Sequence, residues 1–534
     1  PQPAALHWQL PAGGAAASDL GRLADWMPWL AHNALVHYLV PRGLEQFSGG
    51  GWGTRDVCQG PAELLLALGR HDALRDLLCR VFSAQNTDGD WPQWFMFYPR
   101  DAHLRAGDSH GDIVFWPLVA LADYLVASGD GGLLDEPLPF FGSDAVAPMS
   151  GHVARALAVV QRRTVTGTHL AAYGHGDWND ALQPADPAMR AHLCSAWTVT
   201  LHHRMLQGLA AAWRRLGRVA EAAAAAAQAQ AVADDFQRLL LVDGVLTGYA
   251  SFEEGQVSAL LLHPRDTRTG IRYSALAMVH AIADELFTPA QAHAHATLIE
   301  SALTGPDGLR LFDRPLRYTG GTMALFQRGE SASYFGREIG LMYTHAHLRW
   351  AEALARLGRG DALLQALCLA NPIGLCALVP QAAPRQSNCY FSSSDAAFAH
   401  RDEASAHYGR IAAGTVALEG GWRIYSSGAG IAYRLVVQHL LGLVQQQHRL
   451  GLDPVLPPAL DGLEVELPLY GHPVRVRYQV GPRGHGPQSA WLDGHPLLLQ
   501  RGHNRYRAPG VWVAAAPLRQ RLAQGARSLT IQLG

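Results

Sequence analysis

The chain has 534 residues, of which 49% are hydrophobic and 16% charged, and its formal net charge is -2. This composition excludes a disordered, collagen-like or coiled-coil protein, and the small net charge excludes a general attraction to nucleic acid or an anionic membrane. All 43 basic residues are Arg, so the sequence offers no lysine for a Schiff base, a phosphate-binding loop or a kinase site.

The cysteines and the apolar runs bear on location. The 6 Cys include no Cys-x-x-Cys pair, which fits neither a disulfide framework nor a zinc site and favours a reducing, cytoplasmic compartment. No apolar run reaches the roughly 18 residues of a membrane span, and the N-terminal stretch lacks the order of a signal peptide. The chain does not begin with Met, which leaves room for a segment upstream.

Helical hairpins are expected over most of the chain. Residues 1–19 are rich in Pro, Ala and Gly and predict a linker, whereas residues 20–445 repeat apolar side chains at helical spacing. Gly69, Gly217 and Gly358 each stand in a Leu-Gly-Arg triplet between two such stretches, where a helix end favours a left-handed glycine. The triplets are too far apart for a short solenoid repeat, which favours a closed toroid of paired helices over an α-solenoid.

Beyond residue 445 the pattern changes to period two. Residues 463–467, 474–478 and 529–533 alternate apolar and polar side chains between Gly and Pro turns. Residues 446–534 therefore predict a small C-terminal β-domain resembling a partial sandwich. The Ala-rich stretch 220–232 has a helix-forming composition and predicts an ordinary helix.

The first candidate site is the loop of residues 173–180, which ends Gly-Asp-Trp-Asn-Asp. The Trp178 indole can cover the apolar face of a sugar ring while carboxylates bond its hydroxyls, and one carboxylic acid can protonate a glycosidic oxygen. The alternative is a capped turn, in which Asp177 or Asn179 bonds backbone amides and Trp178 lies in the core.

The second candidate is the segment 50–59, which precedes a predicted helix. Arg55 and Asp56 are adjacent and Gln59 follows one turn on, a set that can grip vicinal hydroxyls. The alternative is that Arg55 and Asp56 form an ion pair at a helix start.

The third candidate joins the aromatic stretch 91–95 to the polar loop 105–112. Exposed aromatic rings followed by carboxylates again suggest carbohydrate. Buried rings are the ordinary alternative, which we favour for Phe95 and Phe97.

The fourth candidate is the Ser- and Gly-containing loop 421–430, which feeds an apolar stretch, 431–443, that predicts a helix. Free amides and hydroxyls at a helix start can hold phosphate without lysine, whereas the alternative is that Ser426 or Ser427 is only an N-cap. His345 lies on another predicted helix, where an isolated His is more often structural. Its spacing to His347 places the two on different faces, which argues against a metal pair.

In this order along the chain, the four segments resemble the inverting phosphorylases of glycoside hydrolase family 94 over residues 20–440. The resemblance implies that Asp180 is the general acid. It implies a sugar-binding role for Arg55, Asp56, Gln59, Arg105, Asp112 and Trp178. It also implies phosphate contacts from Arg105, His345, Ser426 and Ser427, of which the Arg105 match is the less specific.

Within the family, residues 53–60, 106–112 and 422–428 look most like the 1,2-β-oligoglucan phosphorylase branch. Two departures stand out. The donor motif ends Gln59-Gly60 where many members have Gln-Asp, so one hydroxyl-binding carboxylate is absent. These relatives also carry a large β-sandwich before the helical toroid, where this chain has room for a linker, so we expect either a truncated protein or one that functions without that domain.

The resemblance implies a mainly α fold, with an (α/α)6 toroid over residues 20–445 before the β-domain. It implies a reversible phosphorolysis of β-linked gluco-oligosaccharides, with β-1,2 linkages by resemblance alone. Asp180 would protonate the interglycosidic oxygen while inorganic phosphate attacks the anomeric carbon from the opposite face, giving α-glucose 1-phosphate. Phosphate is then a substrate, and neither a cofactor nor a metal is expected. The expected partners are oligosaccharide and phosphate, with no nucleic acid or membrane, and family members suggest a homodimer.

Other functions stay open. An inverting hydrolase on the same toroid would need Asp56, Asp112 or Glu338 as the base that activates water, and phosphate dependence separates the two activities. A non-catalytic glucan-binding or scaffolding protein would bind without turnover. An excised domain of a larger glucan-synthesising protein would keep the same catalytic residues.

Overall fold

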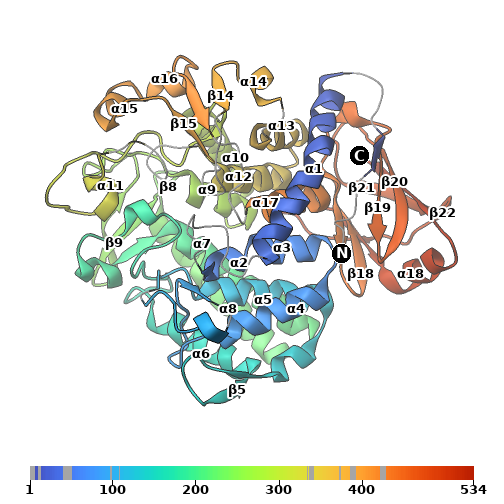
Figure 1. Ribbon diagram of the computed structural model, residues 1–534, viewed down its shortest axis with the longest axis horizontal. Coiled ribbons are helices and arrows are strands. Elements are labelled where there is room, and N and C mark those ends of the chain that lie inside the picture. Colours follow the sequence, from blue (N-terminus) through green and yellow to red (C-terminus); the bar gives the residue numbers. More distant parts are fainter. Residues whose placement is uncertain are drawn as a thin grey trace.

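The computed structural model describes residues 7–9, 14–39, 51–96, 99–107, 109–333, 335, 342–371, 374–384, 393–420 and 428–534. Helices dominate up to about residue 440, and strands dominate after it (Figure 1). The expected mainly α chain with strands toward its C-terminal end is confirmed.

Six helices contact one another in a closed order. α3 packs against α5, α5 against α7, α7 against α9, α9 against α12, α12 against α17, and α17 returns to α3. Nearly every residue of α5 and α9 is buried, as expected for helices that are apolar all round. A Cβ on Gly430 of α17 would overlap the carbonyl oxygen of Gly60, so glycine permits the close approach that joins α17 to α3. The bounds are α3 Gly60–Ala67, α5 Phe115–Ser128, α7 Ala196–Arg215, α9 Ala275–Ala283, α12 Thr344–Leu357 and α17 Gly428–Arg434.

A second set of helices packs on this ring from outside. α4, α8, α10 and α13 each follow a ring helix and lie against it, and α1 lies against α17 and α13. The three Leu-Gly-Arg triplets connect α3 to α4, α7 to α8 and α12 to α13, and their glycines have φ of 65°, 75° and 76°, which confirms the predicted hairpins. The Ala-rich stretch forms α8 as expected. The bounds are α1 Ala15–Leu39, α4 His71–Ser83, α6 Met149–Arg162, α8 Val219–Asp235, α10 Pro289–Leu298 and α13 Gly360–Ala370.

The C-terminal strands form two sheets, which lie beside the ring, to the right of α1 in the view of Figure 1. The six-stranded sheet has the order β1-β19-β20-β25-β21-β22, and the four-stranded sheet the order β17-β18-β24-β23. Along β19 buried side chains alternate with half-buried ones, and along β20 with exposed ones, so the period-two prediction is confirmed for these strands. The bounds are β19 Glu464–Leu469, β20 His472–Gln479, β21 Pro487–Leu492, β22 His495–Pro496, β25 Ser528–Leu533, β17 Leu443–Gln445, β18 Arg449–Leu452, β23 Gln500–Arg501 and β24 Val511–Ala514.

The N-terminal residues differ from the linker predicted over 1–19. β1 (His7–Gln9) pairs antiparallel with the edge strand β19, and α1 already begins at Ala15. An edge strand leaves backbone donors and acceptors free, and β1 uses them. The apolar side chains Leu20, Leu23 and Leu30 bury α1 against its neighbours. The linker prediction is therefore wrong for residues 7–9 and 15–19.

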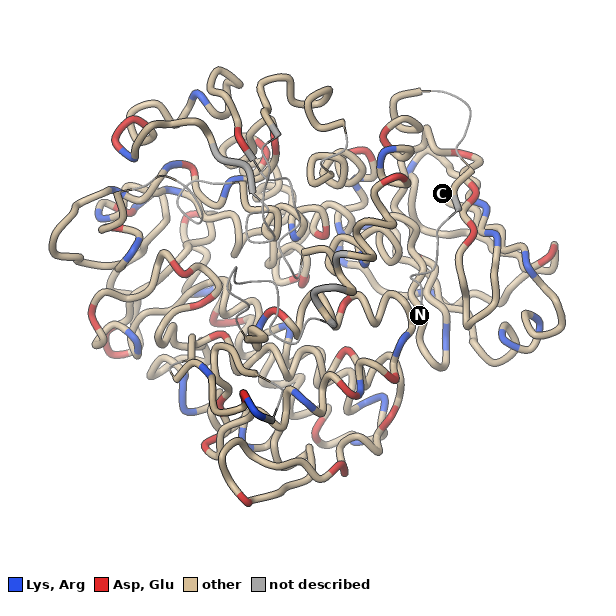
Figure 2. The backbone as a smooth tube through the Cα atoms, viewed as in Figure 1, with Lys and Arg blue, Asp and Glu red and all other residues tan. Residues whose placement is uncertain are grey.

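The apolar stretch 431–443 also differs in detail from the single helix expected. α17 ends at Arg434, a π-helical turn, η7, covers Leu435–Leu440, and β17 starts at Leu443. Within the described ranges, no helix combines the length and the apolar character needed to cross a bilayer. Arg and acidic residues are intermixed along the backbone (Figure 2), in agreement with the small net charge.

Candidate active site

Several of the predicted site residues lie where ring helices begin. Gln59 directly precedes α3, Asp112 shortly precedes α5, and His345 is near the start of α12. Ser195, which was not predicted, caps the N-terminus of α7. The contacts described below join these loops, so motifs far apart in the sequence meet at one end of the ring. Free backbone amides and the positive ends of helix dipoles make such an end favourable for an anion.

Arg55 and Asp112 form a buried ion pair. The Arg55 Nη2 lies 2.7 Å from Asp112 Oδ1, and the two side chains are 8% and 0% exposed. Trp116 Nε1 donates to the other carboxylate oxygen of Asp112 at 3.0 Å. Burial lowers the pKa of the Arg55 guanidinium, but the carboxylates of Asp112 and Asp180 outweigh it and raise the pKa overall. Arg55 is therefore a fixed cation, and both carboxylate oxygens of Asp112 are engaged.

Arg55 thus contacts the loop that precedes α5. The sequence alternative was an ion pair with the adjacent Asp56, and the structure gives Arg55 a hydrogen-bonded ion pair with Asp112. The segment that carries Arg55 is held against the aromatic stretch, because Thr54 Oγ1 donates to the Pro92 carbonyl at 2.6 Å and its backbone N–H to that of Gln93 at 3.0 Å.

Asp180 lies at the start of a short 3-10 turn, η3 (Asp180–Leu182). Its side chain is 38% exposed and its Oδ1 lies 3.7 Å from His110 Nδ1. That oxygen is itself buried and has no hydrogen-bond partner among the described residues. The exposed part of the side chain therefore includes its other oxygen, which leaves the carboxyl available to a ligand on one side.

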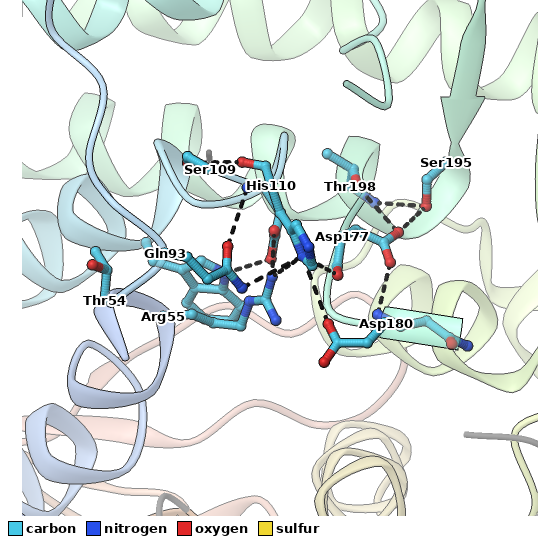
Figure 3. Close-up of polar contacts among 12 residues, drawn as sticks. Thr54, Arg55, Gln93, Ser109, His110, Asp177, Asp180, Ser195 and Thr198 are labelled. Atoms are coloured by element: carbon cyan, nitrogen blue, oxygen red, sulfur yellow. Dashed lines mark hydrogen bonds and ion pairs between the residues drawn. The ribbon is translucent and has the colours of Figure 1, made fainter. Parts of the chain in front are cut away.

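His110 lies between Arg55 and Asp180 (Figure 3). Its Nδ1 is 2.8 Å from the Asp177 carbonyl oxygen and 3.1 Å from Arg55 Nη2, and its Nε2 is 2.7 Å from Gln183 Nε2. Burial, followed by the nearby Arg55 cation, lowers the pKa of this imidazole. A neutral ring that donates from Nδ1 to the Asp177 carbonyl and accepts at Nε2 from Gln183 satisfies these two contacts. In this tautomer Arg55 Nη2 is a charged neighbour of Nδ1 and not its hydrogen-bond donor.

Asp177 anchors the loop from within. Ser195 and Thr198 donate their hydroxyls to Asp177 Oδ2 at 2.7 and 3.4 Å, and the Asn179 N–H donates to Oδ1 at 2.8 Å. Burial, with a smaller contribution from Asp112, raises the pKa of Asp177 to about 7. The capped-turn interpretation therefore describes Asp177 and Asn179, whose side chain accepts from the Ala181 N–H, while Asp180 is left for chemistry.

Trp178 forms an aromatic wall with the start of α12. Its ring meets Tyr343 edge-on at 4.7 Å between centroids and His345 at 5.7 Å, with interplanar angles of 80° and 88°. The indole is half-buried, which suits a face that a sugar ring covers. His347 instead accepts from the Leu309 N–H and donates to the Ala366 carbonyl, so the two histidines point to different partners, as expected from their spacing.

Near this site, two acidic residues and two arginines form a cluster of ion pairs that joins three helices, and each acidic residue binds both arginines. Glu63 of α3 binds Arg349 of α12 and Arg434 of α17, each at 2.6 Å, and Glu352 of α12 binds the same two guanidinium groups at 2.9 and 2.7 Å. We call these residues the four-charge cluster. It reaches the site because Arg349 also donates to the Gln59 side-chain oxygen at 3.3 Å.

The remaining predicted residues are placed differently or not described. Arg105 hydrogen bonds to Asn86 and lies over the Phe141 ring at 3.6 Å, so its contacts lie with these residues and not with the group around Asp180. Asp56 is half-buried beside Arg55. The predictions for Ser426, Ser427 and Glu338 lie outside the described residues. Within the described ranges no cluster of His, Cys and acidic residues could hold a metal ion.

Sequence reasoning missed two contributors. His110 falls inside the polar loop 105–112, and a histidine two positions before the predicted sugar-binding Asp112 was the available signal. The Asp177–Ser195 hydrogen bond had none, because nothing in either segment indicates that a strand, β6 (Leu193–Ser195), returns beside the loop.

Solved structures with a related fold include a sialidase and a rhamnosidase. A sialidase has a TM-score of 0.52 and 11% identity, over 96% of this chain and 42% of that chain. A family GH78 rhamnosidase of Bacillus sp. GL1 has a TM-score of 0.51 and 12% identity, over 90% and 42%. At this identity the likeness concerns the fold alone.

Sequence relatives are phosphorylases and a glucan synthase. The chain is 41% identical over 487 residues to a 1,2-beta-oligoglucan phosphorylase of Listeria innocua serovar 6a, which covers 90% of this chain and 44% of that protein. It is 25% identical to a 3-O-beta-D-glucopyranosyl-beta-D-glucuronide phosphorylase of Paenibacillus borealis, over 72% and 46%, and 25% identical to a cyclic beta-(1,2)-glucan synthase of Rhizobium meliloti, over 84% and 15%.

The chain therefore spans less than half the length of each of these relatives. No family model matches the sequence. The relatives nevertheless confirm the resemblance carried by the motifs: over the length that it shares with them, the chain is similar to phosphorylases of glycoside hydrolase family 94.

Proposed function

We propose that the chain catalyses the reversible, inverting phosphorolysis of β-1,2-linked gluco-oligosaccharides. Inorganic phosphate attacks the anomeric carbon of the terminal glucose, and the bond to the interglycosidic oxygen breaks. The proton of the Asp180 carboxyl moves to that oxygen, and the products are α-glucose 1-phosphate and a glucan shortened by one unit. The choice of the β-1,2 linkage follows the relatives, whose names include a 1,2-beta-oligoglucan phosphorylase.

The observation that carries the proposal is the state of the Asp180 carboxyl. One oxygen is buried without a hydrogen-bond partner among the described residues, while the side chain as a whole is 38% exposed. A carboxyl that is enclosed on one side and open on the other can meet a substrate oxygen in one orientation, which suits a general acid. In the same end of the ring, Arg55 and the helix N-termini supply the positive potential that would hold an anionic nucleophile near a carboxyl group.

The contacts of Asp112 weaken one of the three candidate bases, Asp56, Asp112 and Glu338, that the hydrolase alternative offers. An inverting hydrolase needs a second carboxylate that is free to take a proton from water. Asp112 is fully buried, and its two oxygens are engaged by Arg55 and Trp116, which argues against that role. The same contacts suit a residue that orients Arg55 and the donor sugar.

We assign the other roles as follows. Arg55, Asp56, Gln59, Asp112 and Trp178 bind the donor sugar, and His345 with Ser426 and Ser427 binds phosphate. The Arg105 assignment has less support, because its described contacts lie elsewhere. No resident cofactor or metal enters the scheme, since phosphate is consumed as a substrate.

The finer features of the fold also belong to the proposal. We infer an (α/α)6 toroid over residues 20–445 and a C-terminal β-domain over 446–534. The closed order of the six helices and the outer helices that follow them support this arrangement. A cytoplasmic location and a homodimer stay predictions, and the molecular mass in solution tests the second.

The test compares phosphorolysis and hydrolysis directly. The purified chain is incubated with a short β-1,2-glucan, with and without inorganic phosphate, and glucose 1-phosphate and free reducing sugar are measured together. We expect glucose 1-phosphate that depends on phosphate, and a loss of at least about 100-fold in Asp180→Asn. Sugar release without phosphate would establish the hydrolase, and binding without turnover would establish the binding protein.

A further inference from the structure

His110 is held on each of its polar atoms, although the reaction proposed above gives it no role. Its backbone N–H donates to the Gln93 side-chain oxygen at 3.1 Å, Nδ1 faces the Asp177 carbonyl, and Nε2 faces the Gln183 amide. The residue is 9% exposed. Asp177 and Gln183 thus hold the two nitrogens of the imidazole, while Gln93 holds the backbone of the same residue.

The orientation of the imidazole matters because the Asp180 carboxyl lies next to the ring. Asp180 Oδ1 lies 3.7 Å from His110 Nδ1, too long for a hydrogen bond, and has no other partner among the described residues. The imidazole therefore covers Asp180 Oδ1 without forming a hydrogen bond to it. The carboxyl is left to present its other oxygen outward, toward the open side of the site.

His110 Nδ1 lies next to both aspartates of the loop, Asp177 and Asp180. It points to the carbonyl oxygen of Asp177, whose side chain is anchored to α7 through Ser195. The loop can then neither turn toward nor away from the ring without losing a buried hydrogen bond, which costs more than an exposed one. His110 consequently sets the position of the loop as well as the face of the Asp180 carboxyl.

We propose that His110 is a positioning residue for the general acid: its Nδ1–H fixes the loop of residues 177–180 so that Asp180 presents one oxygen to the interglycosidic oxygen. This inference rests on the proposed function. It predicts that His110 affects proton donation by Asp180 to the leaving group. It does not predict an effect on the binding of the donor sugar.

A substrate whose leaving group needs no proton separates these two possibilities. With β-D-glucopyranosyl fluoride and phosphate, the phosphate oxygen bonds to the anomeric carbon, the C–F bond breaks, and fluoride leaves with the electron pair. Asp180 donates nothing in that reaction. With the glucan, the leaving oxygen must accept the Asp180 proton, so only this substrate should depend on how well the acid is placed.

The variants are chosen to separate hydrogen bonding from shape. His110→Phe keeps the ring and removes both nitrogens. His110→Asn places an amide N–H near the former Nδ1 and can still donate to the Asp177 carbonyl. The matched control is His495→Phe, because Nδ1 of the exposed His495 also faces a backbone carbonyl, that of Asp493, at 2.9 Å. Circular dichroism and the melting temperature check that each variant folds.

We expect His110→Phe to lower kcat on the β-1,2-glucan by about 10- to 100-fold and to change kcat on the fluoride by less than about threefold. His110→Asn should recover much of the glucan activity, and His495→Phe should behave as the wild type. Equal losses on both substrates, or no loss on the glucan, would overturn the positioning role, and His110→Asn supplies this result if His110→Phe does not fold. A wild-type chain that forms no glucose 1-phosphate from either substrate would overturn the proposed function instead.

Discussion

The four-charge cluster should be the most sensitive electrostatic element of the ring. Glu63 contacts Arg349 and Arg434 with one oxygen each, both at 2.6 Å, and the four side chains of the cluster are 4% to 13% exposed. In Glu63→Gln, one carboxylate, Glu352, faces two guanidinium groups, and the new amide N–H₂ points at a group that can only donate. Removing one partner from a buried ion pair destabilises proteins by about 3–5 kcal/mol, and we expect a loss of that size.

The direction of the pH dependence follows from the same contacts. Burial alone would raise the pKa of Glu63, but Arg349 and Arg434 outweigh it and the pKa is lowered. Its contribution to stability is therefore present above its unfolded pKa of about 4.3 and is lost as the pH falls toward the lower folded value. The difference between wild type and variant should be constant from about pH 5 to 8 and shrink below.

The assay is denaturation in urea, followed by Trp fluorescence and circular dichroism together, because a chain of this size can unfold in more than one step. The matched control is Glu221→Gln, which removes an exposed carboxylate paired with Arg218 on α8 and should leave the unfolding midpoint unchanged. A third variant, Glu63→Gln with Arg434→Met, restores equal numbers of the two charges. It should be more stable than the sum of the single losses predicts.

Two results would refute this reasoning. If Glu63→Gln shifts the midpoint no more than Glu221→Gln does, the cluster is too hydrated for its burial to matter. If the double variant loses as much as the two single variants added together, the charges act independently. The four side chains would then contribute to stability through packing and not through electrostatic coupling.

Three further predictions concern the site. Arg55→Met should lower the free energy of unfolding by about 3–5 kcal/mol, because Asp112 is left buried without a cation. The control Arg70→Met breaks an exposed pair with Asp72 and should cost far less. Equal losses in urea denaturation would contradict the buried pair. The pKa of Asp177 is raised to about 7, so its contribution to the free energy of unfolding is full at acid pH and should be lost as the pH rises from about 4 to 7. Asp177→Asn should remove up to about 4 kcal/mol of this pH dependence, measured by urea denaturation across that range. An unchanged pH profile would show that Asp177 does not titrate there. Trp178→Ala should raise KM for the oligosaccharide about tenfold while Trp178→Phe retains most of the affinity, and kinetics with both variants showing no change in KM would exclude a stacking role.

Local structure was largely predictable from the sequence. The Leu-Gly-Arg triplets predicted the three helical hairpins, and the period-two stretches predicted β19, β20 and β25. These features depend on the spacing of apolar residues and on the backbone freedom of glycine, which are properties of neighbouring residues. The order of four motifs along the chain also pointed to a family, and the relatives bear it out.

The N-terminal region shows where such reasoning stops. Pro, Ala and Gly over residues 1–19 indicate a linker, but β1 finds a partner in β19, more than 450 residues further along the chain. Whether a short apolar segment forms a strand depends on an available edge, and no local pattern reveals it.

The same limit applies to the candidate site. The sequence by itself identified Arg55, Asp112, Trp178 and Asp180 as candidates, since carboxylates, a guanidinium and an indole in loops before helices are what sugar binding requires. The family resemblance added His345 as a phosphate contact. The tertiary structure alone decided how they are paired: Arg55 with Asp112, which lies 57 residues further along the chain, and His110 against Asp180. It also assembled the four-charge cluster from three helices. Residues within a few turns of one another decide whether a helix forms. The partner of a buried charge depends instead on which helices pack together. A charge that is removed from water needs a partner, and the fold decides which group lies close enough.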